Sequence, residues 1–222
     1  MNTIREDYLL RLVDEFKNMS DLVILQIDLV KQLFIDKITP EKLEKIKANE
    51  LELDRFEITL RSDIINSLVL QSPRATDLRR IISYMDMITD LERIGDLLYS
   101  VSKKISKINS EEKVYSHLRS DIVKLYVLAT SMVKSAIASF IYENNEMARK
   151  VIDSDDEVDN LNWAIQRELF SLHNCEKSTA FIEEILSLGR IIYNIERIGD
   201  SSTNICEAVI FLTEGIDIRH TH

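Results

Sequence analysis

The 222-residue chain contains very little proline and glycine, with only two prolines and four glycines. Sheet proteins of this size need many tight turns, and such turns favour Gly and Pro because these residues fit the required backbone angles. Their scarcity therefore predicts few connections and long helices. The content of 45% hydrophobic and 30% charged residues is typical of a globular protein with a core, and it excludes general disorder.

Cysteines, long apolar runs and basic surfaces are also scarce. The two cysteines, Cys175 and Cys206, are too few for a disulfide framework, and we expect reduced thiols in a cytoplasmic protein. The longest apolar stretch, near Leu125–Val133, is much shorter than the roughly 20 residues that span a bilayer. We therefore expect association with a membrane only through a partner protein. The net charge of −10 argues against nucleic acid and fits cations or a basic protein surface, although ordinary solubility also accounts for it.

Apolar residues recur at spacings of three and four along nearly the whole chain, as in amphipathic helices. The start signals Thr39-Pro40 and Ser72-Pro73, a weaker one at Ser178 and a glycine cap at Gly215 help to divide the pattern. We predict six helices, over about 1–36, 40–71, 73–108, 113–143, 145–174 and 178–213. Short connections make neighbours antiparallel, so the expected fold is all-α, with three up-and-down helices followed by three more. Trp163 is interpreted as part of a core stripe.

An internal repeat supports this division. The pentapeptide Glu-Arg-Ile-Gly-Asp occurs at 92–96 and again at 196–200, and acidic segments at 50–54 and 155–159 resemble each other. The first pair of segments is 104 residues apart and the second 105, as duplication of a three-helix unit predicts. We therefore expect one repeat over 1–110 and a second over 111–222.

Each repeated segment carries two carboxylates four residues apart, which share one face of a helix. The eight candidate metal ligands are Glu50, Asp54, Glu92, Asp96, Asp155, Asp159, Glu196 and Asp200. Like charges at this spacing destabilise a helix, whereas a hard cation reverses the effect because carboxylate oxygens are its preferred ligands. Gly95 and Gly199 cost their helices about 1 kcal/mol each relative to Ala. Their repetition indicates close approach of a neighbouring helix, or room beside the site.

Two alternatives stay open for these acids. Acidic pairs are common on solvated helix faces that bind nothing, and Arg93 and Arg197 are close enough in sequence to neutralise them. A surface that docks a protein would use the same repeat. Asn204 extends the face of Glu196 and Asp200, and Ser100 holds the equivalent place in the first half.

Several motifs together resemble the PhoU family of bacterial phosphate-signalling regulators. They are SPRATDLRRII at 72–82, DLERIGD at 90–96, DDEVD at 155–159, NIERIGDSSTNICE at 194–207 and GIDIRH at 215–220. The resemblance implies two tandem three-helix bundles in a cytoplasmic protein, often a homodimer, that negatively regulates phosphate uptake. It implies a phosphate ABC transporter and a membrane sensor histidine kinase as partners, and metal binding through the eight acids above. Iron, zinc, manganese and magnesium are the candidate ions. Ser100 departs from the usual Asn, and Glu50 from the more common Asp.

Two other functions compete with a non-enzymatic regulator. A di-iron enzyme on a helical bundle uses Glu-x-x-His motifs, and the residues three before His117, His173 and His220 are Val, Phe and Asp. A helical adaptor without a ligand is the third possibility, which the metal content of the purified protein would distinguish from the first.

Overall fold

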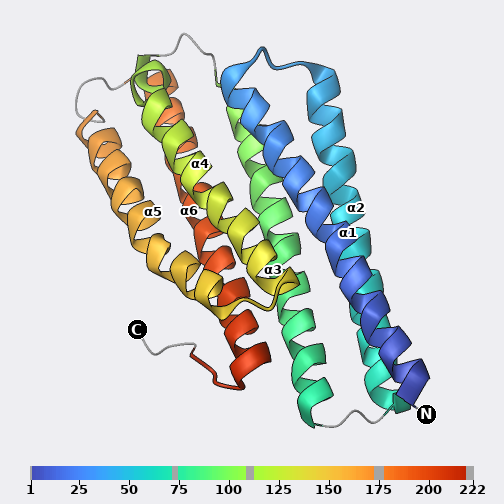
Figure 1. Ribbon diagram of the computed structural model, residues 1–222. Coiled ribbons are helices and arrows are strands. Elements are labelled where there is room, and N and C mark those ends of the chain that lie inside the picture. Colours follow the sequence, from blue (N-terminus) through green and yellow to red (C-terminus); the bar gives the residue numbers. More distant parts are fainter. Residues whose placement is uncertain (1, 72–74, 109–112, 173–177, 219–222) are drawn as a thin grey trace.

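The structure is a computed structural model that describes residues 2–71, 75–108, 113–172 and 178–218. Within these ranges every regular element is a helix, which confirms the expected all-α fold (Figure 1). The helices are α1 (Asn2–Ile35), α2 (Pro40–Gln71), α3 (Ala75–Ile105), α4 (Lys113–Ile141), α5 (Asn145–Leu172) and α6 (Thr179–Glu214).

The helix ends follow the start and stop signals in the sequence. Thr39 Oγ1 accepts a hydrogen bond from the Lys42 amide at 3.4 Å, as an N-cap does at the start of α2. Ser178 caps α6 in the same way, and Gly215 ends α6 in the left-handed conformation, with φ of 74°. The signal at Ser72-Pro73 and the polar break at 109–112 lie outside the described residues.

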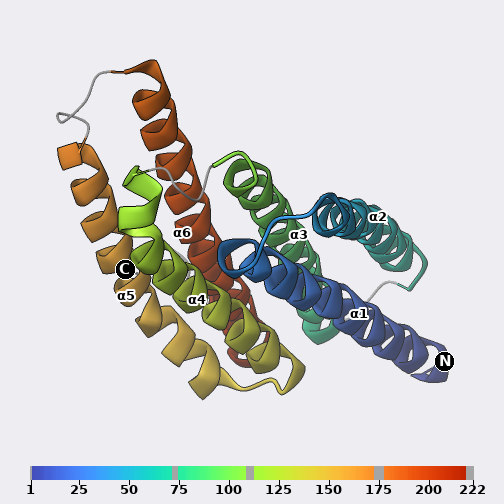
Figure 2. The same cartoon turned by 90° about the horizontal axis from the view of Figure 1, so that it is seen from above.

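The six helices form two three-helix groups that lie side by side. In one, α2 packs on α1 and α3, and in the other α5 packs on α4 and α6. The groups meet through α3 against α6 and α1 against α4, so α2 and α5 lie at the two outer edges (Figures 1 and 2). Two tandem three-helix bundles are thereby confirmed. The boundary at residue 110 stays a prediction.

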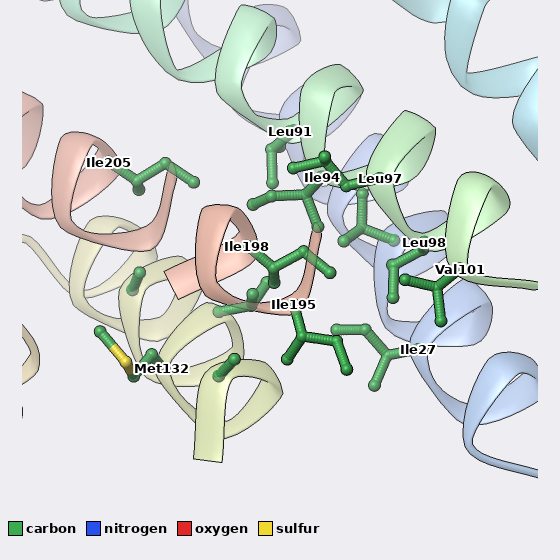
Figure 3. Packing of buried hydrophobic residues seen from close by; sticks show 14 of the residues in the cluster. Ile27, Leu91, Ile94, Leu97, Leu98, Val101, Met132, Ile195, Ile198 and Ile205 are labelled. Atoms are coloured by element: carbon green, nitrogen blue, oxygen red, sulfur yellow. The ribbon is translucent and has the colours of Figure 1, made fainter. Parts of the chain in front are cut away.

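The contact between α3 and α6, called the seam below, is lined by aliphatic side chains. Leu91, Ile94 and Leu98 of α3 gather with Ile195 and Ile198 of α6 (Figure 3), and all five are fully buried. Burying a side chain of this size contributes about 1.5–3 kcal/mol. The seam is therefore a continuous apolar core that fixes the two halves against each other.

Two polar contacts add to this attachment between α1 and α4. The Tyr126 hydroxyl donates a hydrogen bond of 2.7 Å to the Ile27 carbonyl inside the core. Arg119 donates through both Nε and Nη2 to the Phe34 carbonyl at the end of α1. Both contacts use a carbonyl on the first half and a side chain on the second, so they fix the register between the halves.

Helix α4 is long and apolar enough, by length and composition alone, to cross a membrane. The expectation that no segment reaches this length holds only for the uninterrupted apolar run near 125–133. More than half of the apolar window in α4 is buried inside the bundle. Contacts with α1, α5 and α6 therefore account for the composition of this helix.

The interpretation of Trp163 as a core residue is wrong. Its side chain is 65% exposed, and Arg167 lies over its ring at 5.5 Å from the centroid. The buried face of α5 runs along Val158, Ile165 and Leu169 instead. Since α5 contacts only α4 and α6 and lies at the outer edge, its opposite face is left to solvent.

Candidate metal centres

Each half brings carboxylates from two adjacent helices together at one place. In the first half, Glu50 and Asp54 of α2 meet Asp96 of α3, with one oxygen of each within 4.8 Å of the others. We call this group the first centre. The second centre contains Asp155 and Asp159 of α5 and Asp200 of α6, within the same distance.

The remaining two predicted ligands, Glu92 and Glu196, lie beside these triads. The pKa of Glu92 rises to about 7, because of burial first and then the charges of Asp96 and other acids. Burial and the charges of Asp200 and Asp159 raise the pKa of Glu196 likewise to about 7. The predicted convergence of four acids in each half therefore corresponds to a tight triad plus one glutamate that feels its charge.

The triads themselves also resist ionisation. In the second centre, burial and the neighbouring Asp159 and Asp200 raise the pKa of Asp155 to about 6. In the first centre, burial raises the pKa of Glu50 and of Asp96, and the charge of Asp54 adds to both shifts. Both centres therefore hold more negative charge than their surroundings stabilise.

Neutralisation by individual basic partners does not remove this excess charge. Among the described residues, none of the eight predicted ligands takes part in an ion pair. Arg197 lies over the Tyr193 ring at 5.6 Å from the centroid. Its charge and that of Arg93 lower the pKa of Asp200, but burial and Asp159 outweigh them.

The second centre also contains carboxylate oxygens without a hydrogen-bond partner. Asp155 Oδ1 and Glu196 Oε2 are buried atoms that no donor in the described chain reaches. A buried acceptor left unpaired costs about 1–3 kcal/mol, and more when it is charged. The atoms that could bind a metal at both centres are all carboxylate oxygens, which suit hard divalent or trivalent cations. The residues present therefore fit a metal ion.

The motif glycines lie where the outer helices approach α3 and α6 most closely. A Cβ added to Gly199 would lie 3.3 Å from Asp155 Oδ1 and 3.4 Å from Val158 Cγ1. A Cβ added to Gly95 would lie 2.6 Å from Leu53 Cδ1, well inside van der Waals contact. Close approach of the neighbouring helix therefore holds at both glycines, and at Gly199 the neighbouring group includes the carboxylate of Asp155.

Sequence reasoning missed Glu57 at the first centre. Its charge raises the pKa of both Glu92 and Asp96, while Arg61 pairs with it at 3.2 Å. Glu57 follows Asp54 by three residues and so shares its helix face, a signal that was present in the sequence. The equivalent position in the second half is Asn162, so only the first centre has this additional acid.

Asn204 was expected to extend the acidic face of α6, but it lies at the seam. Its amide donates a hydrogen bond of 3.2 Å to Asp90 of α3. Ser100, at the equivalent position of the first half, accepts a hydrogen bond of 2.9 Å from Asn194. The departure at Ser100 therefore changes the contact between the halves.

The model of the PhoU domain family matches this chain twice, over residues 16–105 and 122–209. This chain belongs to the PhoU family. The two matches fall on the two halves of the fold, each with one acidic centre. The resemblance noted in the sequence motifs is thereby confirmed.

Individual members of the PhoU family resemble the chain over most of its length. The phosphate-specific transport system accessory protein PhoU homolog of Aquifex aeolicus is 30% identical over 224 residues, which cover 96% of this chain and 97% of the relative. The homolog of Clostridium acetobutylicum is 30% identical over 184 residues, covering 79% and 82%. The crystal structure of PhoU from Pseudomonas aeruginosa has a TM-score of 0.84 at 25% identity, covering 95% of this chain and 99% of that one.

Proposed function

We propose that this protein is a non-enzymatic regulator of phosphate transport whose two acidic centres bind metal ions. The observation that carries the metal proposal is the duplicated carboxylate triad, each with oxygens within 4.8 Å and without an ion-pair partner in the described chain. In the second centre, two buried oxygens without hydrogen-bond partners add to it. A bound cation would stabilise the ionised acids that burial and mutual repulsion now disfavour.

Asp155, Asp159 and Asp200 would hold the ion of the second centre, with Glu196 beside them, and Glu50, Asp54 and Asp96 that of the first, with Glu92. Iron, manganese, magnesium and zinc are the candidate ions, and the purely carboxylate donor set favours the harder ones. The ion would supply positive charge that ties the outer helix of each half to α3 or α6.

The regulatory part of the proposal rests on family membership. The relatives carry the name of accessory proteins of the phosphate-specific transport system. We infer that this chain restrains phosphate uptake from the cytoplasm, as a homodimer that contacts the transporter ATPase subunit and a sensor histidine kinase. A ligand alters such contacts only by binding one conformation better than another. Metal at both centres would favour one arrangement of α2 and α5 against the core.

The composition of the centres favours this function over a di-iron enzyme. Within the described residues both centres consist of carboxylates alone, whereas the bundle enzymes combine Glu with Glu-x-x-His motifs. We therefore propose that metal has a binding and positioning role in this chain.

The metal proposal is tested with the Asp96→Asn/Asp200→Asn variant, which removes one ligand from each centre. Metal-free protein is titrated with Mn²⁺, Mg²⁺, Zn²⁺ and, without oxygen, Fe²⁺ by calorimetry. The control is Asp21→Asn/Asp153→Asn, which removes the same charge at exposed helix positions outside both centres. We expect affinity to fall at least tenfold in the first variant and to stay unchanged in the control. Equal affinities in both variants would contradict the proposal.

The regulatory part is tested separately by affinity capture of the tagged full chain from phosphate-starved and phosphate-replete cells. We expect the transporter ATPase subunit and a sensor kinase among the captured proteins, in amounts that change with phosphate. If neither protein is captured in either condition, the proposed partners are contradicted. The metal proposal would not be affected by that result.

A further inference from the structure

The seam between α3 and α6 has two ends that correspond to each other through the duplication. Each residue of α3 has its counterpart 104 positions later in α6. At one end Asn204 donates to Asp90, and at the other Asn194 donates to Ser100. Asn194 is the counterpart of Asp90, and Asn204 is that of Ser100. The same two positions of the repeat are therefore in contact at both ends of the seam.

The charges at the two ends are opposite. Asp86 corresponds to Arg190, and Lys103 to Glu207. Burial and the charges of Asp86 and Glu207 raise the pKa of Asp90, despite the hydrogen bond from Asn204. At the other end, burial and the charges of Arg190, Lys103 and Lys107 lower the pKa of Lys104. The duplication has thus produced one anionic and one cationic end from equivalent positions.

The cationic end has a defined arrangement of donors. Ser100 Oγ accepts two hydrogen bonds, from Asn194 Nδ2 at 2.9 Å and from Lys104 Nζ at 3.1 Å. A hydroxyl has two acceptor lone pairs and one donor, so both lone pairs are used and the O–H is left to donate. Ser100 donates to no other group in the described chain. Its hydroxyl hydrogen is therefore available to a further acceptor beside an ammonium group.

The cations at this end form no ion pair in the described chain, although two glutamates lie near them. Lys104, Lys107 and Arg190 take part in no ion pair with any acid that the structure describes. Lys107 and Arg190 line a cavity of about 410 Å³ together with Ser187, Glu183 and Glu184. Glu184 is buried, and it accepts a hydrogen bond of 2.7 Å from the Tyr115 amide.

We propose that the cationic end of the seam binds a small oxyanion of the phosphate class. Lys104, Lys107 and Arg190 supply the charge, and the Ser100 hydroxyl and the second amide hydrogen of Asn194 supply neutral donors. Lys104 and Asn194 both contact Ser100, and the charges of Lys107 and Arg190 act on Lys104. Charge-assisted bonds to phosphate oxygens are among the strongest in proteins. This site is separate from the metal centres and does not depend on them.

The experiment is a calorimetric titration of the metal-free full chain with inorganic phosphate, in EDTA and at constant ionic strength. The test variant, Lys104→Ala/Arg190→Asp, places at the cationic end the residues that occupy the counterpart positions, Ala208 and Asp86. The control, Lys124→Ala/Arg167→Asp, makes the same change of charge at exposed positions of α4 and α5.

We expect saturable binding of one phosphate per chain. The affinity should be at least tenfold lower in the test variant and unchanged in the control. Phosphate should also shift the backbone amide resonances of Ser100 and Asn194 before others. Absence of saturable binding by the unmodified chain would overturn the proposal, as would equal loss in both variants. If the test variant unfolds, as judged by circular dichroism, Ser100→Ala alone is used, and unchanged affinity and resonance shifts there would overturn it.

Discussion

The two acidic centres occupy equivalent positions in the duplicated fold but differ in how their charge is accommodated. Each triad has one exposed acid, Asp96 in the first centre and Asp159 in the second. The difference lies in two buried oxygens of the second centre, Asp155 Oδ1 and Glu196 Oε2, which no hydrogen-bond donor in the described chain reaches. Because water screens charge only where it has access, we expect the second centre to depend more strongly on a cation than the first.

The largest expected effect is a difference in metal affinity between the halves. Asp155→Asn/Asp200→Asn should weaken the tighter of two binding steps by at least about 100-fold, since each of the two lost charged contacts is worth roughly 1.5–3 kcal/mol. Asp54→Asn/Asp96→Asn should affect the weaker step and leave the tighter one unchanged. Calorimetric titration of the metal-free proteins with Mn²⁺ measures both steps.

The same charge removed by Asp21→Asn/Asp153→Asn provides the control, because both aspartates are exposed and lie outside the centres. If the variants of the two centres weaken the same binding step equally, the difference in burial has no bearing on affinity. The comparison between the halves would then be wrong even though both centres bind metal.

The two motif glycines should respond differently to alanine. Gly199→Ala presses on Asp155 and should weaken the second metal site about tenfold, while the gain of about 1 kcal/mol in helix propensity preserves stability. Gly95→Ala collides with buried Leu53 instead and should destabilise the fold by about 1–2 kcal/mol, with metal affinity unchanged. Urea unfolding and metal titration of each variant separate the outcomes. Identical behaviour of the two variants would contradict these assigned contacts.

Helix positions and the pairing of acids could be predicted from sequence because both depend on local spacing. The caps at Thr39 and Gly215 and the meeting of Glu50 and Asp54 with Asp96 followed from such patterns. Trp163 could not be placed, because periodicity shows that a helix has an apolar face but not which faces have neighbours. At the outer edge of the bundle α5 has neighbours on one side only.

The polar contacts between the two halves could not be predicted from the sequence either. Asn204 lies two turns from Glu196 on the same helix, so helix geometry alone assigned it to the acidic face. Its partner, Asp90, is 114 residues away in the chain. Only the crossing of α3 and α6 determines this pairing. Local sequence therefore predicted which acids come together in each half but not the polar contacts between α3 and α6.

The pH dependence of stability gives a smaller effect that distinguishes metal-free from metal-bound protein. In the metal-free fold burial and neighbouring acids raise the pKa of Glu92 and of Glu196 to about 7, above the ordinary glutamate value of 4.5. Between these values the folded state binds more protons than the unfolded state. Stability contributed by these groups is therefore present below about pH 4.5 and is lost as the pH rises to about 7.

Urea unfolding in EDTA at several pH values measures this dependence. Glu92→Gln/Glu196→Gln should show a shallower loss of stability from pH 5 to 8 than the unmodified chain. Saturating metal should also reduce the loss, because the ion binds the deprotonated acids. If stability falls with pH in parallel for the unmodified chain and the variant, these two glutamates have the same pKa in the folded and unfolded states.

The smallest expected effect compares the two ends of the seam. Asn204→Ala removes the hydrogen bond to Asp90, which lies in a half-buried position with a pKa of about 6. Since that bond favours the ionised form, its loss should raise the pKa of Asp90 further and cost about 1–2 kcal/mol of stability at neutral pH. Asn194→Ala should cost less, about 0.5–1 kcal/mol, because Ser100 still accepts from Lys104 at 3.1 Å. Urea unfolding and a titration of the Asp90 carboxyl carbon by NMR measure both effects. A larger cost for Asn194→Ala would show that the cationic end contributes more to joining the two halves than the anionic end.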